Sequence, residues 1–334
     1  ALEQFYRLGR AQNFEQWRTA MAMHAIPSFN FIYGDNTGRI AYVYNAILPR
    51  RAAGYDWSGC VPGDTHATLW RQGDWVNAPE LIAPSSGWLY SANGAPWSST
   101  DPSADMHASD YPDAAPGIET YLTNRGLRAV EVLSPLHTIS EAQLEAAKFD
   151  VTYSAHSRMA EAIHAILAAD ASHDDELANI QTQLRGWDTR SNSENHGAAL
   201  ANLMFEPLYE ARRNRQPDPN PIVTARAAAQ YLTQHFHRLD PAWGDVLRLR
   251  HGNVDLPMDG AKAVLRGIRW AREPDGRLNA NFGDGLMMIM DWAPDHTLQV
   301  RVVSQWGASS HETSPHYNDQ SALYAAHGWR IQDW

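Results

Sequence analysis

The sequence contains little cysteine, little lysine and no long apolar run. Its 334 residues include a single cysteine, Cys60, which excludes an internal disulfide framework and a zinc site built from several cysteines. Lys148 and Lys262 are the only lysines, so arginine supplies nearly all of the positive charge. The most apolar run, 286–292, is far shorter than the roughly 20 residues that a membrane-spanning helix needs. We therefore expect no membrane span, while the cysteine content leaves the compartment open.

Charge and apolar content together indicate a globular protein that does not bind nucleic acid. Lys and Arg number 27 and Asp and Glu 38, so the formal net charge is −11, the wrong sign for a protein that neutralises phosphates. Hydrophobic residues make up 44% of the chain and 13 residues are tryptophan, which is too apolar for a disordered polymer. A chain of this size can bury about 75% of the surface that it exposes when unfolded. A large core is therefore expected.

Two hairpins are predicted near opposite ends of the chain. Aromatic and β-branched residues at 29–33 and 39–44 flank a turn-forming cluster that contains Gly, Asp and Asn. A second pair of apolar runs, 285–292 and 297–303, flanks the turn-forming residues 293–296. A hairpin alone is barely stable in water, so each is expected to pack within a larger structure.

Helical signals precede the first hairpin and fill the middle of the chain. Asn13 and Gln16 stand at capping-box spacing before a helical apolar pattern, which Pro27 ends. Ser140 and Gln143 predict another capped helix by the same spacing. Further helical stripes run through 160–167, 177–184 and 198–209.

The order of these elements predicts the fold class and three parts. Strands, then helices, then strands is the order of an α+β protein rather than of an alternating parallel α/β sheet. We expect a hairpin and loop-rich part over 1–117, a mostly helical segment over 118–236, and C-terminal strands over 237–334 that return to the core. The stretch 49–117 is longer than an ordinary connection, so it is expected to hold short strands and binding loops.

Common catalytic motifs are absent from the sequence. The 15 histidines offer pairs such as His164 with His173 and His235 with His237, but no His-Glu-x-x-His run occurs. No Gly-x-Ser-x-Gly elbow and no phosphate-binding glycine loop is present. Local motifs therefore predict neither a zinc site nor one of the common hydrolase or nucleotide sites.

Seven short blocks instead follow one another along nearly the whole chain. They are the region from Asn13 to Arg51, Gly54-Tyr55-Asp56-Trp57, Val61-Pro62-Gly63, Ser86-Gly87-Trp88 through Asn93 to Pro96, Thr123-Asn124-Arg125, Gly186-Trp187-Asp188, and Ser314-Pro315-His316-Tyr317-Asn318-Asp319-Gln320. In this order they resemble the later part of the β-chain of the penicillin acylase family, with a closer likeness to its acyl-homoserine-lactone acylase branch. The ordered set is far more specific than any single block.

The resemblance implies a fold, and it implies that the nucleophile lies on a different segment from the residues of this chain. The implied fold is the four-layer αββα sandwich of N-terminal-nucleophile hydrolases, with a helical insertion. That family cleaves amides with the hydroxyl of a serine at the new N-terminus of the β-chain, whose α-amine serves as base. Ala1 has no hydroxyl, and the family's blocks place Asn13 well inside the β-chain. We therefore expect the partners to be an α-chain and the N-terminal part of the β-chain, and this chain alone to be inactive.

Asn93 and Arg125 are the candidate catalytic residues that the resemblance implies. Asn93 stands where the family places its oxyanion-stabilising asparagine, whose amide meets the alkoxide of the tetrahedral intermediate. The alternative is that Asn93, beside Gly94, occupies a turn that tolerates positive φ. Arg125 matches a family arginine that orients Asn93 or the free α-amine, and its alternative is a salt bridge on a helix surface.

The remaining matched residues are expected to be structural. Asn30 would supply a hydrogen bond at a strand end, and Asp35 would cap the first hairpin turn. His316 and Asp319 suggest a catalytic dyad, but they lie in the block that resembles the family's closing packing motif. No cofactor is expected. Some relatives bind calcium with an Asp-Pro pair in this region, and the Asp-Trp pair that begins at Asp56 here supports that ion only weakly.

The interpretation is an amidohydrolase that cleaves small N-acyl amides, either acyl-homoserine lactones or penicillin-like compounds. The chain would contribute the oxyanion asparagine and part of the sheet. The alternative is a non-catalytic fragment, or a structural or binding subunit of the same fold. The family's usual compartment implies a periplasmic or secreted protein. The acyl-chain length and the leaving amine are not encoded here, because the residues of the acyl pocket are expected upstream.

Overall fold

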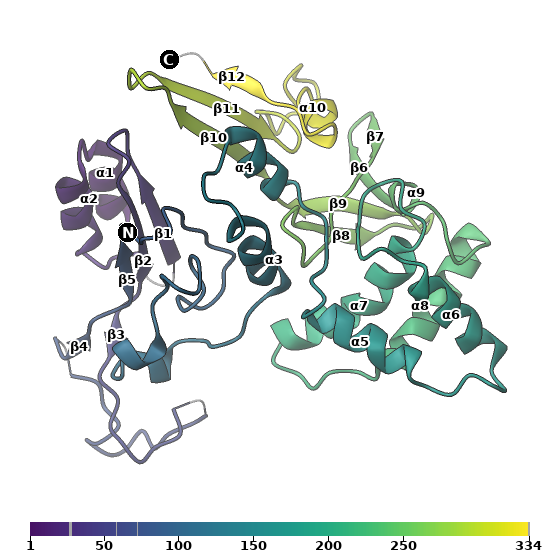
Figure 1. Ribbon diagram of the computed structural model, residues 1–334, viewed down its shortest axis with the longest axis horizontal. Coiled ribbons are helices and arrows are strands. Elements are labelled where there is room, and N and C mark those ends of the chain that lie inside the picture. Colours follow the sequence, from purple (N-terminus) through teal and green to yellow (C-terminus); the bar gives the residue numbers. More distant parts are fainter. Residues whose placement is uncertain (27–28, 58, 72, 333–334) are drawn as a thin grey trace. The chain divides into compact units, whose positions relative to one another are not determined.

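The computed structural model describes residues 1–26, 29–57, 59–71 and 73–332, and it divides into a first unit, Ala1–Gly126, and a second unit, Leu127–Trp334 (Figure 1). The first unit contains α1 (Leu2–Arg10), α2 (Phe14–Met21), β1 (Phe29–Gly34), β2 (Ile40–Asn45), β3 (Leu48–Pro49), β4 (Trp75–Val76) and β5 (Glu80–Ile82). Two short 3₁₀ turns, Ala108–Asp110 and Ala115–Gly117, follow β5. The boundary between the units falls inside helix α3 (Asn124–Leu133).

The second unit is a mixture of helices and short sheets. Its helices after α3 are α4 (Glu141–Lys148), α5 (Arg158–Leu167), α6 (Asp175–Arg185), α7 (Ala198–Arg213), α8 (Pro221–Phe236), α9 (Trp243–Val246) and α10 (Ser321–Ala325). Its strands are β6 (Leu247–His251), β7 (Val254–Pro257), β8 (Ile268–Arg272), β9 (Leu278–Gly283), β10 (Leu286–Trp292), β11 (Leu298–Ser304) and β12 (Arg330–Gln332). The α+β class predicted from the element order is confirmed.

The first hairpin forms as predicted and gains a third strand. β1 and β2 pair antiparallel from Phe29 opposite Asn45 to Gly34 opposite Ile40, and β5 adds to the other edge of β2. Helix α2 packs against this sheet through Phe14, Trp17 and Met21, because these apolar residues recur on one helix face. The hairpin is thus stabilised by burial that it could not supply alone.

The predicted cap of α2 is present, and the helix is shorter than expected. The Asn13 side chain accepts a hydrogen bond from the Gln16 backbone N–H at 3.0 Å. The Gln16 side chain reaches back to the N–H of Gln12 rather than to that of Asn13. The helix ends at Met21, and Pro27, its predicted terminator, lies outside the described residues.

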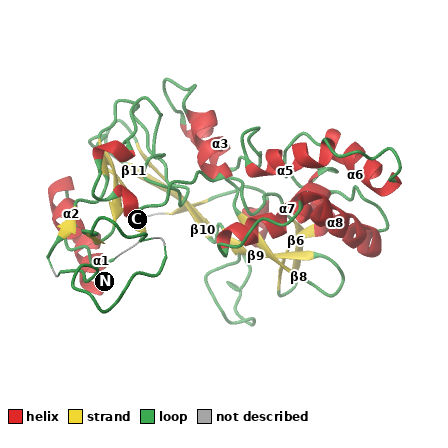
Figure 2. Cartoon of the chain, turned by 90° about the horizontal axis from the view of Figure 1, so that it is seen from below, coloured by secondary structure: helices red, strands yellow, loops and turns green. Residues whose placement is uncertain are grey.

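The main core of the second unit lies between helices and the sheet of order β7-β6-β9-β8. Helices α7 and α8 lie next to this sheet, and α5 and α6 pack against these helices (Figure 2). Residues such as Ile166, Ile180 and Leu232 are completely buried in this core. The predicted stripes 160–167, 177–184 and 198–209 all fall within α5, α6 and α7. The capping box of Ser140 and Gln143 begins α4.

The second predicted hairpin is also present. β10 and β11 pair antiparallel from Leu286 opposite Ser304 to Trp292 opposite Leu298, and β12 adds to β11.

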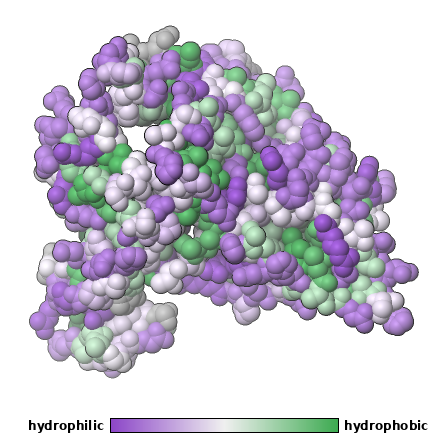
Figure 3. Space-filling view, in the orientation of Figure 1, coloured by the Kyte–Doolittle hydropathy of each residue, from purple (hydrophilic) through white to green (hydrophobic). Residues whose placement is uncertain are grey.

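Polar residues cover most of the face shown in Figure 3, and apolar side chains interrupt them in several places. No helix in the described ranges is both long and apolar enough to cross a membrane.

Candidate active site

The loop that carries Asn93 is held at its base by one carboxylate. Asp105 accepts hydrogen bonds from the backbone and side chain of Ser99, at 2.7 and 2.9 Å, and from the backbone of Thr100. Trp88 is buried, and its carbonyl accepts from the hydroxyl of Thr100 at 2.6 Å. Burial also raises the pKa of Tyr90 to about 12, so its hydroxyl stays protonated in the physiological range. The two sides of the loop are therefore fixed to each other.

Asn30 of β1 attaches this loop to the first sheet. Its Nδ2 donates to the Ser91 hydroxyl at 3.2 Å and to the Gly94 carbonyl at 3.5 Å. These two partners flank Asn93 on either side. The hydrogen bond expected of Asn30 is thus made to the loop that carries Asn93. In the sequence, this asparagine stands out only because it lies inside an aromatic strand.

Asn93 stands at the tip of a tight turn. Its φ is +56°, in the left-handed region that asparagine tolerates better than most residues. Its side chain is exposed, and the neighbouring Ala92 and Ala95 are buried. The turn conformation proposed as the alternative explanation of this residue is therefore present. It does not account for the contact that the side chain makes.

Arg125 reaches Asn93 from the start of α3. The Thr123 hydroxyl accepts from the backbone N–H of Gly126 at 3.1 Å, as an N-terminal cap does. Arg125 follows in the first turn of the helix, and its Nη2 donates to Oδ1 of Asn93 at 3.1 Å. The structure thus brings together the two residues singled out in the sequence, both within the first unit.

This contact determines the polarity of the Asn93 amide. A guanidinium carries only donors, so the atom that faces Arg125 is the amide oxygen. The Nδ2 group, with two N–H donors, is left at the exposed end of the side chain. An amide anchored by its oxygen in this way can offer a hydrogen bond to a developing negative charge without first reorienting.

Asp35 caps the first hairpin turn, as expected. Its carboxylate accepts from the N–H and hydroxyl of Thr37 and from the hydroxyl of Tyr33 at 2.7 Å. Desolvation acts to raise the pKa of Asp35, but these hydrogen bonds outweigh it and the pKa is lowered. Burial and the bond to Asp35 together raise the pKa of Tyr33 to about 12. These residues stabilise the turn and contact neither Asn93 nor Arg125.

The closing block around His316 packs within the second unit. His316 Nδ1 lies 3.0 Å from Asp319 Oδ2, on a side chain that is 64% exposed. Asn318 donates to the carbonyl of His251, whose ring stacks on Tyr317 with centroids 4.0 Å apart. Burial lowers the pKa of His251. No hydroxyl among the described residues bonds to the His316 ring, so the geometry here is that of a packed loop.

A metal centre finds no support in the part of the chain that the structure describes. Within those residues, no group of three or more His, Cys, Asp or Glu side chains is arranged to hold an ion. Cys60 is exposed and unbonded to another cysteine.

Comparison with known proteins places the chain in a class and then in a family. The structure is similar to that of a thermostable penicillin G acylase from Alcaligenes faecalis, with a TM-score of 0.59 and 15% sequence identity. The match covers 99% of this chain and 69% of that chain, and it defines the fold as that of N-terminal-nucleophile hydrolases. The penicillin amidase family model matches residues 1–333. The chain belongs to this family, which supports an amidohydrolase type of function.

Proposed function

We propose that this chain is the later part of the β-chain of an amide hydrolase that cleaves N-acyl amides with an apolar acyl group. The substrate would be an acyl-homoserine lactone or a penicillin-like compound. The contact between Arg125 and Asn93 is the observation that carries the proposal, because it presents an amide donor as an oxyanion site requires. Membership of the penicillin amidase family supports the type of bond cleaved.

In the proposed reaction, the nucleophile is a serine on another segment. Its hydroxyl oxygen attacks the substrate carbonyl carbon, and its proton passes to the α-amine of the same serine. The carbonyl oxygen becomes an oxyanion, to which Nδ2 of Asn93 donates. When the intermediate collapses, the C–N bond breaks and the leaving amine takes the proton. Water then hydrolyses the acyl ester and releases the carboxylic acid.

An uncovered sheet face supports the expected partner, the N-terminal part of the β-chain. Leu286, Met288 and Met290 alternate along β10 and are 64%, 44% and 51% exposed. β10 is also the edge strand of its sheet among the described strands. A long apolar edge of this kind normally pairs with or packs against another element. We propose upstream strands of the same β-chain as that element.

The proposed location, the periplasm or the extracellular space, follows from the family's usual compartment. The single cysteine is compatible with it but does not require it.

The decisive experiment is to assemble this chain with the chain that carries the serine and to measure turnover by the assembly. Intact-mass analysis of native material identifies any co-purifying chain, and an N-terminal serine on it is the expected result. The assembled protein is then assayed on N-acyl-homoserine lactones of increasing acyl length and on phenylacetyl amides. Turnover by the assembly, and none by this chain alone, is expected. An assembly that contains the serine chain and is inactive on both substrate classes would favour the non-catalytic alternative.

A further inference from the structure

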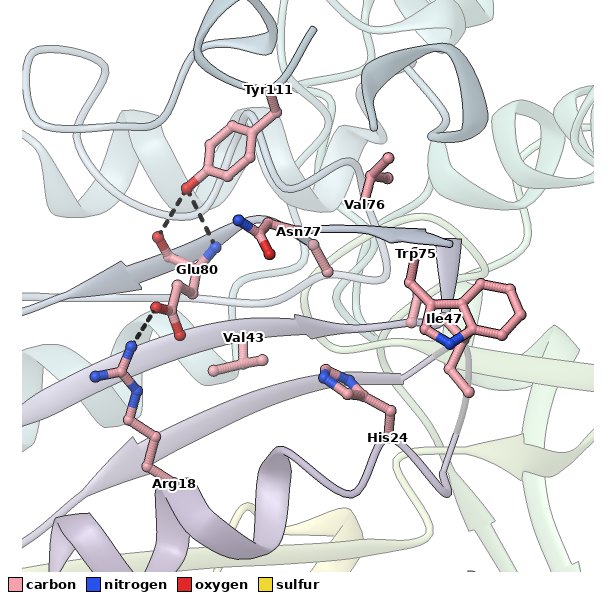
Figure 4. A pocket seen from close by; sticks show the side chains of 11 residues that line it. Arg18, His24, Val43, Ile47, Trp75, Val76, Asn77, Glu80 and Tyr111 are labelled. Atoms are coloured by element: carbon pink, nitrogen blue, oxygen red, sulfur yellow. Dashed lines mark hydrogen bonds and ion pairs between the residues drawn. The ribbon is translucent and has the colours of Figure 1, made fainter. Parts of the chain in front are cut away.

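The first unit contains a half-open pocket that neither Asn93 nor Arg125 lines. Its volume is about 560 Å³, and it lies between β2, β4, β5 and the residues after α2 (Figure 4). Small-molecule sites typically measure about 300–1,000 Å³. All of its lining residues belong to the first unit, so the pocket is formed within that unit.

One side of the pocket offers a partly exposed apolar wall. Ile47 and Trp75 are each 44% exposed, and the buried Val43 and Val76 also line the pocket. Figure 4 shows the indole of Trp75 beside Ile47. A flat apolar wall of this kind suits a ring, because aromatic faces stack with offset or edge contacts.

The other side presents an unsatisfied polar atom. Nδ1 of His24 is buried and has no hydrogen-bond partner among the described residues. The backbone of His24 has φ +46°, and its N–H donates to the Met21 carbonyl at 3.1 Å, so the end of α2 fixes where this residue lies. The imidazole lies in the pocket between Val43 and Ile47 (Figure 4). A ligand that bonds to Nδ1 would remove the cost of leaving this atom unpaired.

The charges around the pocket are already balanced. Arg18 and Glu80 form an ion pair at 2.6 Å, and Tyr111 donates to the carbonyl of Glu80 at 3.1 Å. A charged ligand would therefore find no unpaired opposite charge among these lining groups. The polar side selects for hydrogen bonding rather than for charge.

We propose that this pocket binds an uncharged planar ring compound that carries one hydrogen-bonding group. The ring would lie against Trp75 and Ile47, and the polar group would bond to Nδ1 of His24. The proposal is independent of the hydrolytic function, since it concerns a different set of residues and is tested by binding alone.

Phenol is the probe, because it combines an aromatic ring with one O–H donor. The test uses the 334-residue chain with Met288→Lys and Met290→Lys, two changes on exposed β10 that are expected to keep it monomeric and that lie outside the pocket. Saturation-transfer NMR and a titration on it should give a dissociation constant on the order of 1 mM, as the ligand has few atoms. Benzoate, of the same shape but anionic, should bind at least about tenfold more weakly, since a buried charge without a partner is unfavourable.

Three variants separate the pocket from non-specific binding. Ile47→Trp fills the cavity from an exposed position, so it should abolish phenol binding without disturbing the fold. Leu144→Trp adds the same ring at a site on α4 that is 49% exposed and outside the pocket, and binding should be unchanged. His24→Asn keeps a residue that tolerates positive φ and removes the imidazole. It should weaken phenol binding about two- to tenfold, the value of one hydrogen bond.

The proposal is overturned if phenol shows no saturation transfer at millimolar concentration. It is overturned equally if Ile47→Trp, folded as judged by its melting curve, binds phenol as tightly as Leu144→Trp does. Equal affinity for phenol and benzoate would show that the pocket does not exclude a negative charge, and it would contradict the assignment of an uncharged ligand.

Discussion

The guanidinium of Arg125 holds the oxygen end of the Asn93 amide at 3.1 Å, across 32 positions of sequence. Arg125 lies in the first turn of α3, where the helix dipole favours carboxylates rather than cations. The helix therefore does not explain an arginine at this position, whereas the contact with Asn93 does. Asn30 adds a second constraint, because it bonds to the residues on both sides of the same turn. Arg125 thus orients the side-chain amide of Asn93, and Asn30 fixes the backbone of the turn that carries it.

The first prediction separates the amide of Asn93 from its backbone conformation. Asn93→Gly keeps a residue suited to φ +56° and removes the amide. In the assembled enzyme proposed above, this change should lower kcat by about 10²–10³-fold, roughly 2.7–4 kcal/mol, with little change in KM, because the proposed role of the lost donor is in the transition state. Steady-state kinetics with a melting curve on the same preparation is the measurement. Asn93→Ala is less informative, since it adds strain at positive φ.

The matched control for this prediction is Arg215→Gly. Arg215 is exposed and has φ +54°, so the substitution makes the same backbone change away from the loop. It should leave kcat unchanged. Asn195 is unsuitable as a control asparagine, because its Oδ1 accepts from the N–H groups of Gly197 and Ala198 at the start of α7. Equal effects of Asn93→Gly and Arg215→Gly would remove Asn93 from the site.

A second prediction concerns Asn30 as a positioning residue. Asn30→Ala removes the bonds to Ser91 and Gly94 and leaves Asn93 and Arg125 unchanged. We expect kcat of the assembled enzyme to fall about tenfold, less than for Asn93→Gly, since small misplacement of a catalytic group is costly but not abolishing. The double variant Asn30→Ala/Asn93→Gly should be no slower than Asn93→Gly alone. Fully additive losses would show that Asn30 acts independently of Asn93.

Much of the secondary structure could be predicted because its signals are local. The hairpin at 29–44 and the capping box at Ser140 depend on turn and cap residues that are neighbours in sequence. The sheet of order β7-β6-β9-β8 was not predicted, because β6 pairs in parallel with β9 across more than one intervening strand. Such pairing depends on the packing of helices and strands around one common core, which no local pattern encodes.

The candidate site was predictable only in part, for a related reason. The resemblance to a family pointed to Asn93 and Arg125. Their contact depends on the tertiary structure, and their separation in the sequence does not imply it. Asn30 was expected to be structural, since a strand asparagine gives no indication of which loop it meets. The pocket beside His24 had no sequence signal, because its walls come from four separate segments.

A third prediction concerns a buried charge in the second unit. Arg266 is fully buried, donates to the Tyr324 carbonyl at 3.0 Å and lies 3.5 Å from Asp259. Arg266→Met leaves the Asp259 carboxylate with less compensation and should lower the free energy of unfolding by about 3–5 kcal/mol. Arg7→Met breaks a surface pair with Glu3 and should cost less than about 1 kcal/mol. Urea denaturation of both variants is the check, and equal losses would contradict the prediction.

A fourth prediction gives the sign of a pH effect. Hydrogen bonding to Arg250 is the main cause that lowers the pKa of Asp275 from 3.8 to about 2 in the folded state. The carboxylate therefore contributes stability that is present above pH 3.8 and is lost as the pH falls through about 2. Asp275→Asn should flatten the decline of the melting temperature in this window. Asp291→Asn, on exposed β10, is the control and should leave the decline unchanged.

The last prediction tests the apolar face of β10 as an assembly surface. This chain alone is expected to aggregate, because Leu286, Met288 and Met290 expose apolar surface on an edge strand. Met288→Lys/Met290→Lys should keep the chain monomeric in light scattering, since charged side chains on an edge strand oppose pairing. The same pair of changes should weaken its association with the upstream segment. Leu144→Lys, at an exposed helix position, should change neither property. A wild-type chain that is monomeric and melts cooperatively by itself would contradict the need for a partner, and it would favour an independent binding module.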